Sequence, residues 1–310
     1  MTALICGSMA YDTIMVFHDS FKNHILPDKL HILNVSFLVP TMRREYGGCA
    51  GNIAYNLHLL QEDATIMATV GHDFEPYAQW LSRNGISTRF IKVLDDQYTG
   101  QAYITTDIND NQITAFHPGA MSFSHFNSVP VDEKITIGIV SPDGKQGMQE
   151  HAEQFAEAGI PFIFDPGQGM PMFDGEELMR FLDLATYATF NDYEAELVQQ
   201  RTGLSLEQLA AKVDALIITL GGQGSKIYTN GQCIDIPSAP VSQLADPTGC
   251  GDAYRAGLLY GLINEYDWEV TGRIASLMGA IKIEHNGTQN HVFTLPDFKL
   301  RYQDSFGTSF

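Results

Sequence analysis

The chain has few basic residues and no long hydrophobic run. Its 310 residues include 18 lysines and arginines against 37 acidic residues, which gives a net charge of −19 and a pI near 4.7. Such a surface repels nucleic acids and anionic membranes, so we expect neither as a partner. No stretch of about 18 apolar residues predicts a membrane span, and the N-terminus enters the apolar segment 3–6 without a basic leader. We therefore expect a soluble, cytoplasmic protein.

Cysteine is also scarce. The four cysteines lie far apart and form no C-x-x-C pair, so neither a zinc site nor a disulfide framework is indicated: Cys6, Cys49, Cys233 and Cys250. This usage is consistent with a reducing cytoplasm.

Two common nucleotide-binding motifs are missing. Gly224-Ser225-Lys226 lacks the earlier glycine and the G-K-[ST] order of a Walker A loop. No G-x-G-x-x-G follows the first apolar strand, which argues against a dinucleotide site.

Short β-like runs alternate with helical periods along most of the chain. This alternation predicts an α/β fold in which helices cover both faces of a mostly parallel sheet, with ligands at the carboxyl ends of the strands. The predicted strands are 4–6, 65–70, 89–94, 134–140, 161–165, 187–191 and 216–220, and the predicted helices are 49–60, 149–157, 192–202 and 207–213. A hairpin around Asn230-Gly231 joins 226–229 to 233–236.

Two segments interrupt the alternation. The stretch 31–39 is β-rich without a following helix, and 101–106 and 112–117 flank Asp110-Asn111 as a hairpin. We expect a single domain, 1–310, with a discontinuous small β-sheet lid from about 14–46 and 97–118. The exposed edges of this sheet predict pairing of two lids in a homodimer.

The most informative segment is Asp246-Pro-Thr248-Gly249-Cys250-Gly251-Asp252, which precedes an apolar run at helical spacing. Its glycines let a ligand approach the backbone, and the N-terminus of the following helix attracts an anion. A carboxylate at this place suits a group that takes a proton from a hydroxyl attacking a phosphate. The alternative is that Asp252 caps the helix.

Other polar groups also follow predicted strands. Asp12 can accept hydrogen bonds from a diol or serve a turn, and Gly48 with Asn52 can contact a ligand or pack a helix closely on the sheet. Asn191 and Glu194 carry oxygens suited to Mg²⁺, or cap a helix. The segment 219–224 is open backbone that phosphates can approach.

Together, in this order, these motifs resemble the ribokinase-like (PfkB) family of carbohydrate and nucleoside kinases over nearly the whole chain. The family signatures are Gly47-Gly48 with Asn52, the loop 246–252, and Asn191-x-x-Glu194. Several segments resemble the bacterial adenosine/nucleoside kinase branch: 25–31, 36–39, 116–122, 191–194, 246–249 with Arg255, and 284–289.

The resemblance implies a ribokinase-like three-layer α/β/α fold and ATP-dependent phosphorylation of the 5′-hydroxyl of a purine ribonucleoside. It implies adenosine as the first substrate. Asp252 would be the base, and the amides of Gly249, Cys250 and Gly251 would form an anion hole. The implied substrate-binding residues are Ser8, Asp12, Gly48, Asn52, Phe116 and Gln168. The implied ATP-binding residues are Asn191, Thr219, Gly221, Gly224 and Thr248.

By the same resemblance, Mg²⁺ would be held by Asn191 and Glu194 through water, and a monovalent cation such as K⁺ would lie near 284–289. One position departs from the expected pattern. Ala102 stands where a second lid aromatic is expected, and the neighbouring Tyr103 faces the other side of a strand. We therefore expect a roomier pocket that accepts inosine or guanosine besides adenosine. The alternatives are a sugar kinase for ribose or fructose, disfavoured by Phe116 and Gln168, and a non-catalytic nucleoside-binding regulator, disfavoured by Asp252.

Overall fold

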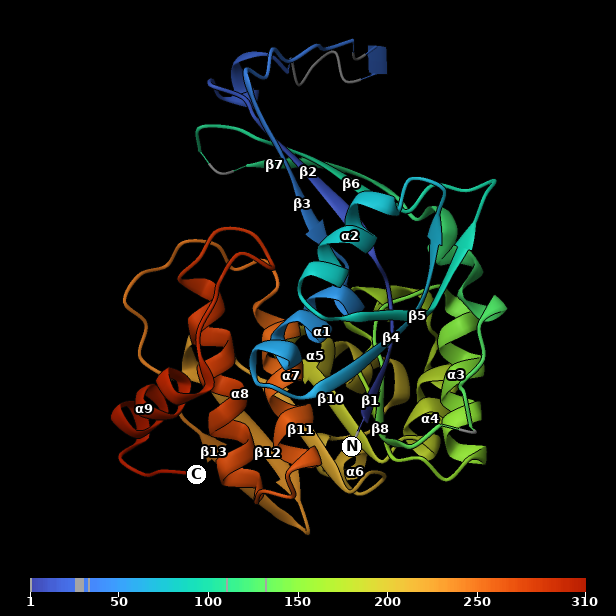
Figure 1. Cartoon of the computed structure of the whole chain (residues 1–310), viewed down its shortest axis with the longest axis vertical. Helices are drawn as coiled ribbons and strands as arrows, with labels where there is room; N and C mark the ends of the chain where they lie inside the picture. Colours follow the sequence, from blue (N-terminus) through green and yellow to red (C-terminus); the bar gives the residue numbers. More distant parts are fainter. Residues whose placement is uncertain (1, 26–30, 33, 110, 132) are drawn as a thin grey trace.

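The computed structural model describes residues 2–25, 31–32, 34–109, 111–131 and 133–310. A nine-stranded sheet forms the centre of the molecule, in the order β13-β12-β11-β10-β9-β8-β1-β4-β5 (Figure 1). Strands β11 to β5 in this order are parallel, and the hairpin β12–β13 continues the sheet in antiparallel fashion. The strands are β1 (Thr2–Cys6), β4 (Asp63–Gly71), β5 (Ser87–Leu94), β8 (Ile135–Val140), β9 (Phe162–Phe164), β10 (Tyr187–Asn191), β11 (Ala215–Thr219), β12 (Ser225–Thr229) and β13 (Gln232–Ile236).

Helices cover both faces of this sheet. One core packs the helices α1 (Cys49–Leu59), α2 (Glu75–Arg83), α7 (Cys250–Ile263), α8 (Trp268–Ile283) and α9 (Leu295–Phe306). The other packs α3 (Lys145–Glu157), α4 (Gly175–Leu184), α5 (Asp192–Thr202) and α6 (Leu206–Ala210). Consecutive residues of β1 enter different cores, Ala3 and Ile5 the first and Leu4 and Cys6 the second. A strand buried on both faces explains why its sequence is apolar without alternation.

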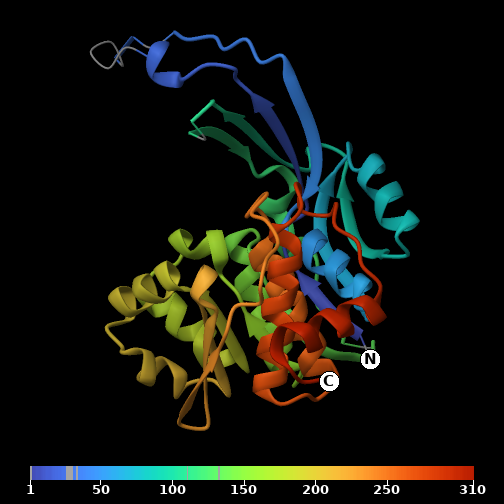
Figure 2. The same cartoon turned by 90° about the vertical axis from the view of Figure 1, so that its left-hand side faces the viewer.

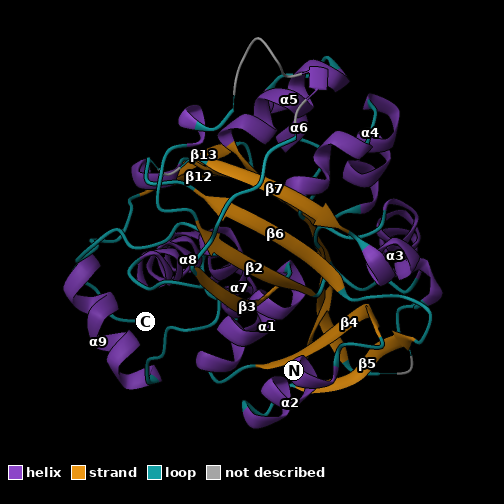
Figure 3. Ribbon diagram, turned by 90° about the horizontal axis from the view of Figure 1, so that it is seen from above, coloured by secondary structure: helices purple, strands orange, loops and turns teal. Residues whose placement is uncertain are grey.

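A second sheet of four strands stands above the carboxyl ends of the parallel strands (Figures 1 and 2). Its order is β3-β2-β6-β7, from β2 (Ala10–Val16), β3 (Thr41–Gly47), β6 (Gly100–Thr106) and β7 (Gln112–His117). Strands β2 and β6 are parallel, and the two outer pairs are antiparallel. Seen from above, this sheet lies across the body between α8 and α3 (Figure 3).

The α/β fold and its small separate sheet are confirmed, as are the seven predicted parallel strands and both hairpins. Asn230 and Gly231 adopt positive φ of 49° and 72°, as the tight turn between β12 and β13 requires. Other predictions differ from the structure. The stretch 31–39 contains no strand in its described residues, because the chain there has no neighbouring strand and pairs only from Thr41 onward. Residues 26–30 of the segment 25–31, which carries part of the resemblance, lie outside the described residues.

Helix boundaries also differ from prediction. The helix expected from 149 begins at Lys145, and the helix expected over 207–213 ends at Ala210. All four cysteines are free. None of the helices in the described part of the chain is long and apolar enough to cross a membrane.

Candidate active site

Most predicted site residues lie at one edge of the main sheet, where the parallel strands end beneath the small sheet (Figure 2). Ser8 follows β1, Gln168 follows β9, Asn191 ends β10 and Thr219 ends β11. Because β11, β10, β9, β8 and β1 are consecutive neighbours, the predicted ATP-binding residues lie at one end of this edge. The predicted substrate-binding residues lie at the other.

Two helices begin at this edge directly after glycines with positive φ. Gly48 precedes α1 with φ 85°, and Gly249 precedes α7 with φ 81°. A Cβ on Gly48 would lie 2.5 Å from the carbonyl oxygen of Ser8, so no other residue fits there without a shift. The N-cap of α7 is Gly249, and no side chain caps the helix. Asp252 therefore does not serve as the cap, the alternative that the sequence left open.

The Asp252 carboxylate is instead bonded to the first glycine loop. Its Oδ2 accepts a hydrogen bond of 2.8 Å from Nδ2 of Asn52 on α1. The pKa of Asp252 is raised to about 6, mainly by burial; the Asn52 bond opposes the rise, and the nearby Asp165 contributes to it. The Cys49 thiol lies beside the same carboxylate, and burial raises the pKa of this thiol well above its ordinary value.

The three amides predicted to form an anion hole are not equivalent. The Cys250 N–H donates to the carbonyl of Pro247 at 3.2 Å. The N–H groups of Gly249 and Gly251 donate to no protein group among the described residues. Two free amides therefore stand at the positive end of the fourteen-residue helix α7, where an anion is favoured.

Asp12 lies on β2, opposite Glu45 of β3 and Ala102 of β6. A Cβ on Gly47 would lie only 2.4 Å from Oδ2 of Asp12, so the glycine leaves room for the carboxylate. The pKa of Asp12 is raised to about 6, mainly by burial and further by the carboxylates of Glu45 and Asp246. Such a desolvated acceptor suits hydroxyl groups that can donate to it.

The strand register of the small sheet places an aromatic side chain in line with Asp12 and Ala102. Ala102 pairs with Phe116 of β7, so Asp12, Ala102 and Phe116 share one face. Two inter-strand spacings put Phe116 about 10 Å from Asp12. Phe116 is 52% exposed and free to contact a ligand. Tyr103 pairs with Thr13 and points to the opposite face, as predicted.

Two further predicted substrate residues differ in their surroundings. Ser8 is 8% exposed, and its Oγ accepts a bond of 3.1 Å from the N–H of Cys49. Gln168 is exposed in the 3-10 turn Gly167–Met172 that follows β9.

Asn191 and Glu194 form a reciprocal helix cap, the alternative considered from the sequence. Asn191 Oδ1 accepts from the Glu194 N–H at 2.7 Å, and the Glu194 carboxylate accepts from both nitrogens of Asn191 at 2.9 Å. In the described chain, no three His, Cys, Asp or Glu side chains gather as a metal site. Each Glu194 oxygen keeps a lone pair, so these residues fit Mg²⁺ through its waters rather than by direct ligation.

The remaining predicted ATP-binding residues lie around two loops. Thr219 is partly buried and Thr248 exposed, and Gly221 has no atom within 4 Å of its Cβ position. Gly224 is buried, and a Cβ there would lie 2.0 Å from the carbonyl oxygen of Ile236. Its lack of a side chain is thus explained by packing within the protein.

The ammonium group of a buried lysine on α8 donates hydrogen bonds to the loop before α7 and to the segment after α8. Nζ of the fully buried Lys282 donates to the carbonyls of Asp246 at 2.7 Å and His285 at 3.1 Å. The Asp246 carboxylate accepts from the N–H groups of Thr248 and Gly287, each at 2.9 Å. The segment 284–289 is therefore joined to the glycine loop.

Sequence reasoning missed two sets of residues. Arg255 was noted only as a mark of the resemblance, yet it forms a buried ion pair of 2.9 Å with Asp165 at the end of β9. Gln289 is 2% exposed and bonds to Asn52, Tyr77 and Trp80. No local signal predicts these contacts, because they join segments far apart in sequence.

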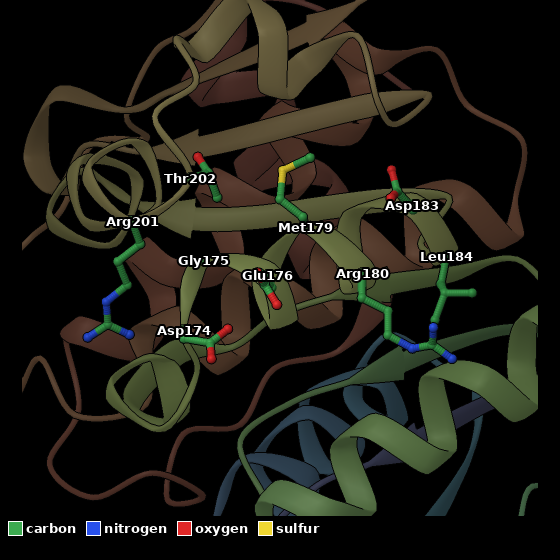
Figure 4. A pocket seen from close by; sticks show the side chains of 9 residues that line it. All are labelled: Asp174, Gly175, Glu176, Met179, Arg180, Asp183, Leu184, Arg201 and Thr202. Atoms are coloured by element: carbon green, nitrogen blue, oxygen red, sulfur yellow. The ribbon is translucent and has the colours of Figure 1, made fainter.

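A surface pocket lies elsewhere on the molecule and contains neither glycine loop (Figure 4). It lies around α4 and the end of α5, and both of its arginines already have protein partners. Arg180 pairs with Glu153 at 2.6 Å, and Arg201 donates to two backbone carbonyls. It contains none of the predicted site residues, so we place the active site at the glycine loops.

Comparisons with known proteins show which family the chain resembles. The family model of pfkB family carbohydrate kinases matches residues 9–294. A nucleoside kinase of Methanocaldococcus jannaschii is 30% identical over 263 residues, covering 84% of this chain and 86% of the relative. The structure of Burkholderia thailandensis nucleoside kinase in complex with inosine is 52% identical, with a TM-score of 0.90 over 99% of both chains. A structure of the same enzyme in complex with ADP-inosine, 53% identical, has a TM-score of 0.87 over 99% of this chain and 97% of that one.

Proposed function

Because this chain belongs to the pfkB family of carbohydrate kinases, and thus transfers a phosphoryl group to an alcohol, we propose that it is a nucleoside kinase. Its proposed reaction is ATP-dependent phosphorylation of the 5′-hydroxyl of purine ribonucleosides: adenosine first, and also inosine and guanosine.

One observation carries the choice of a nucleoside over a free sugar. The row of Asp12, Ala102 and Phe116 offers a carboxylate for the ribose hydroxyls and an exposed ring for the base on one face of the small sheet. A bare sugar needs no stacking surface. Ala102 leaves the base with a single aromatic partner, which supports acceptance of several purines.

Asp252 is the proposed base. Its raised pKa of about 6 leaves it ionised near neutrality, with more proton affinity than an ordinary carboxylate. Its main work is to orient the 5′-hydroxyl and to take the proton late in a loose transition state. The free amides of Gly249 and Gly251 face the transferring group, and the Cys250 amide joins them only if it leaves Pro247.

The nucleotide is assigned to the other end of the edge, with Asn191, Thr219, Gly221 and Thr248 as its neighbours. Mg²⁺, held through water by Asn191 and Glu194, would neutralise charge on the phosphates. The monovalent cation is a separate part of the proposal. Two carbonyls at its expected place already accept from Lys282, so a K⁺ titration at constant ionic strength decides whether an ion adds to this ammonium.

The small sheet is the proposed lid, and its edge strand β7 is exposed at every residue. Pairing of two such lids would cover Ile113, which is 44% exposed. Analytical ultracentrifugation tests this dimer, and a monomer at high protein concentration would contradict it.

The decisive experiment measures ADP release from Mg·ATP with adenosine, inosine, guanosine, cytidine, ribose and fructose. Turnover restricted to nucleosides, strongest with purines and weak with 2′-deoxyadenosine, is expected. Turnover only on free sugars would refute the proposal. Nucleoside binding without turnover would indicate a non-catalytic protein.

A further inference from the structure

Gln289 uses every polar atom of its buried side chain at the back of the site. Its Oε1 accepts from the indole Nε1 of Trp80 at 2.9 Å. Its Nε2 donates to Oδ1 of Asn52 at 3.0 Å and to the hydroxyl of Tyr77 at 2.6 Å. Asn52 then donates to Asp252. We call the set Trp80, Gln289, Asn52 and Asp252 the amide chain.

The two ends of the amide chain fix its direction. An indole nitrogen can only donate, so the amide oxygen of Gln289 must face Trp80 and its nitrogen must face Asn52. A carboxylate can only accept, so the NH₂ group of Asn52 must face Asp252. Tyr77 donates to the carbonyl of Gly47 at 2.9 Å and is therefore an acceptor toward Gln289. Every amide orientation follows from these partners.

We propose that Trp80 and Gln289 are positioning residues that hold the Asn52 amide with its NH₂ group toward the catalytic carboxylate. This inference rests on the proposed role of Asp252. If the Asn52 amide turned over, its oxygen would face a carboxylate oxygen, and the carboxylate would lose a donor. Neither Trp80 nor Gln289 contacts the carboxylate, so both act through Asn52.

Other charges near Asp252 remain constant when the amide chain is cut. They are Asp165 after β9, Arg255 on α7 and Lys282 on α8, and the Cys49 thiol lies beside them. A change in the pH dependence on cutting the amide chain is therefore assigned to the lost donor.

The test replaces one indole and uses the other as its control. Trp80→Phe keeps an aromatic ring and removes only the N–H, which frees Gln289 to turn over. We expect kcat to fall about three- to tenfold, which is the worth of one hydrogen bond, with KM for ATP unchanged. The acid limb of kcat should move to higher pH. Trp268→Phe removes the other tryptophan, which begins α8 and packs on Tyr187 of β10. This control should leave both kcat and the position of the acid limb unchanged.

A double variant separates positioning from packing. In an Asp252→Asn background, Trp80→Phe should cost almost nothing further, because its effect passes through the carboxylate. Gln289→Glu should be more severe than Trp80→Phe, since a carboxylate cannot donate to Asn52. Thermal unfolding of each variant shows whether it is folded.

Three outcomes would overturn the inference. The first is a Trp80→Phe variant that behaves like Trp268→Phe, and the second is a lowered kcat without movement of the acid limb. The third is a loss from Trp80→Phe that is as large in the Asp252→Asn background as in the wild-type protein. Near-normal kcat in Asp252→Asn alone would instead remove the proposed base, so the two failures are distinguishable.

Discussion

Asp252→Asn is the most direct test of the proposed chemistry. The substitution is isosteric, and the new amide oxygen can still accept the 2.8 Å bond from Asn52, so the site should keep its shape. What is lost is the ability to take a proton. Removing such assistance costs about 10²–10⁴-fold in kcat, or about 2.7–5.4 kcal/mol of barrier. KM for ATP and for nucleoside should change by less than about threefold.

The pH dependence provides an independent measure of the same carboxylate. Asp252 accepts a proton only when ionised, so activity is present above its pKa and lost as the pH falls through it. With a pKa of about 6, the ionised fraction drops from about nine-tenths at pH 7 to about one-tenth at pH 5. The wild-type kcat at saturating nucleoside should therefore fall about tenfold over this interval.

The assay is ADP release at saturating Mg·ATP and nucleoside, with both proteins measured from pH 5 to pH 8. Saturation matters because Asp12 also has a pKa raised to about 6 and should act through nucleoside binding. The Asp252→Asn variant should show a low kcat without this acid limb. A kcat within about threefold of wild type would refute the reasoning, and so would an acid limb that persists unchanged in the variant.

Three further predictions concern neighbouring residues. Gly47→Ala brings a Cβ within 2.4 Å of the Asp12 carboxylate and should displace it. In steady-state kinetics, KM for nucleoside should rise roughly tenfold or more while KM for ATP stays unchanged. An equal rise in both KM values would contradict this prediction. Asp165→Leu leaves the buried guanidinium of Arg255 without its ion-pair partner. The free energy of unfolding, measured in urea, should therefore fall by about 3–5 kcal/mol. A loss below about 1 kcal/mol would show that the ion pair contributes little to stability. The raised pKa of Cys49 keeps its thiol protonated, so a maleimide should label it slowly by mass spectrometry at pH 7.5, and rapid labelling with loss of activity would be the contrary result.

Local patterns in the sequence were enough to predict the buried strands, one hairpin and the glycine loops of this protein. Buried strands were evident as apolar runs, and Asn230-Gly231 marked its hairpin, because these signals depend on neighbours in the chain. Gly48 and Gly249 stood out because close backbone approach and positive φ need glycine wherever they occur. The order of the glycine loops along the chain was enough to indicate the family, which the matching family model confirms.

The sequence did not indicate the helices α2, α4, α8 and α9, nor the strand β2 as a separate element. It placed a β-rich stretch at 31–39, whereas pairing begins only at Thr41. A strand is stabilised by its partner strands, and partners distant in sequence leave no local mark.

Tertiary structure alone decided the surroundings of the proposed base. Asn52 and Asp252 are 200 positions apart, and Asn52 and Gln289 are 237 apart, yet each pair shares a hydrogen bond. The raised pKa of Asp252 follows from burial and from Asp165, which only folding brings near. Tertiary structure also showed which acidic motif caps its helix: Asn191 and Glu194 do, and Asp252 does not. Residue types and spacing can nominate a site, but hydrogen-bond direction and desolvation are properties of the packed chain.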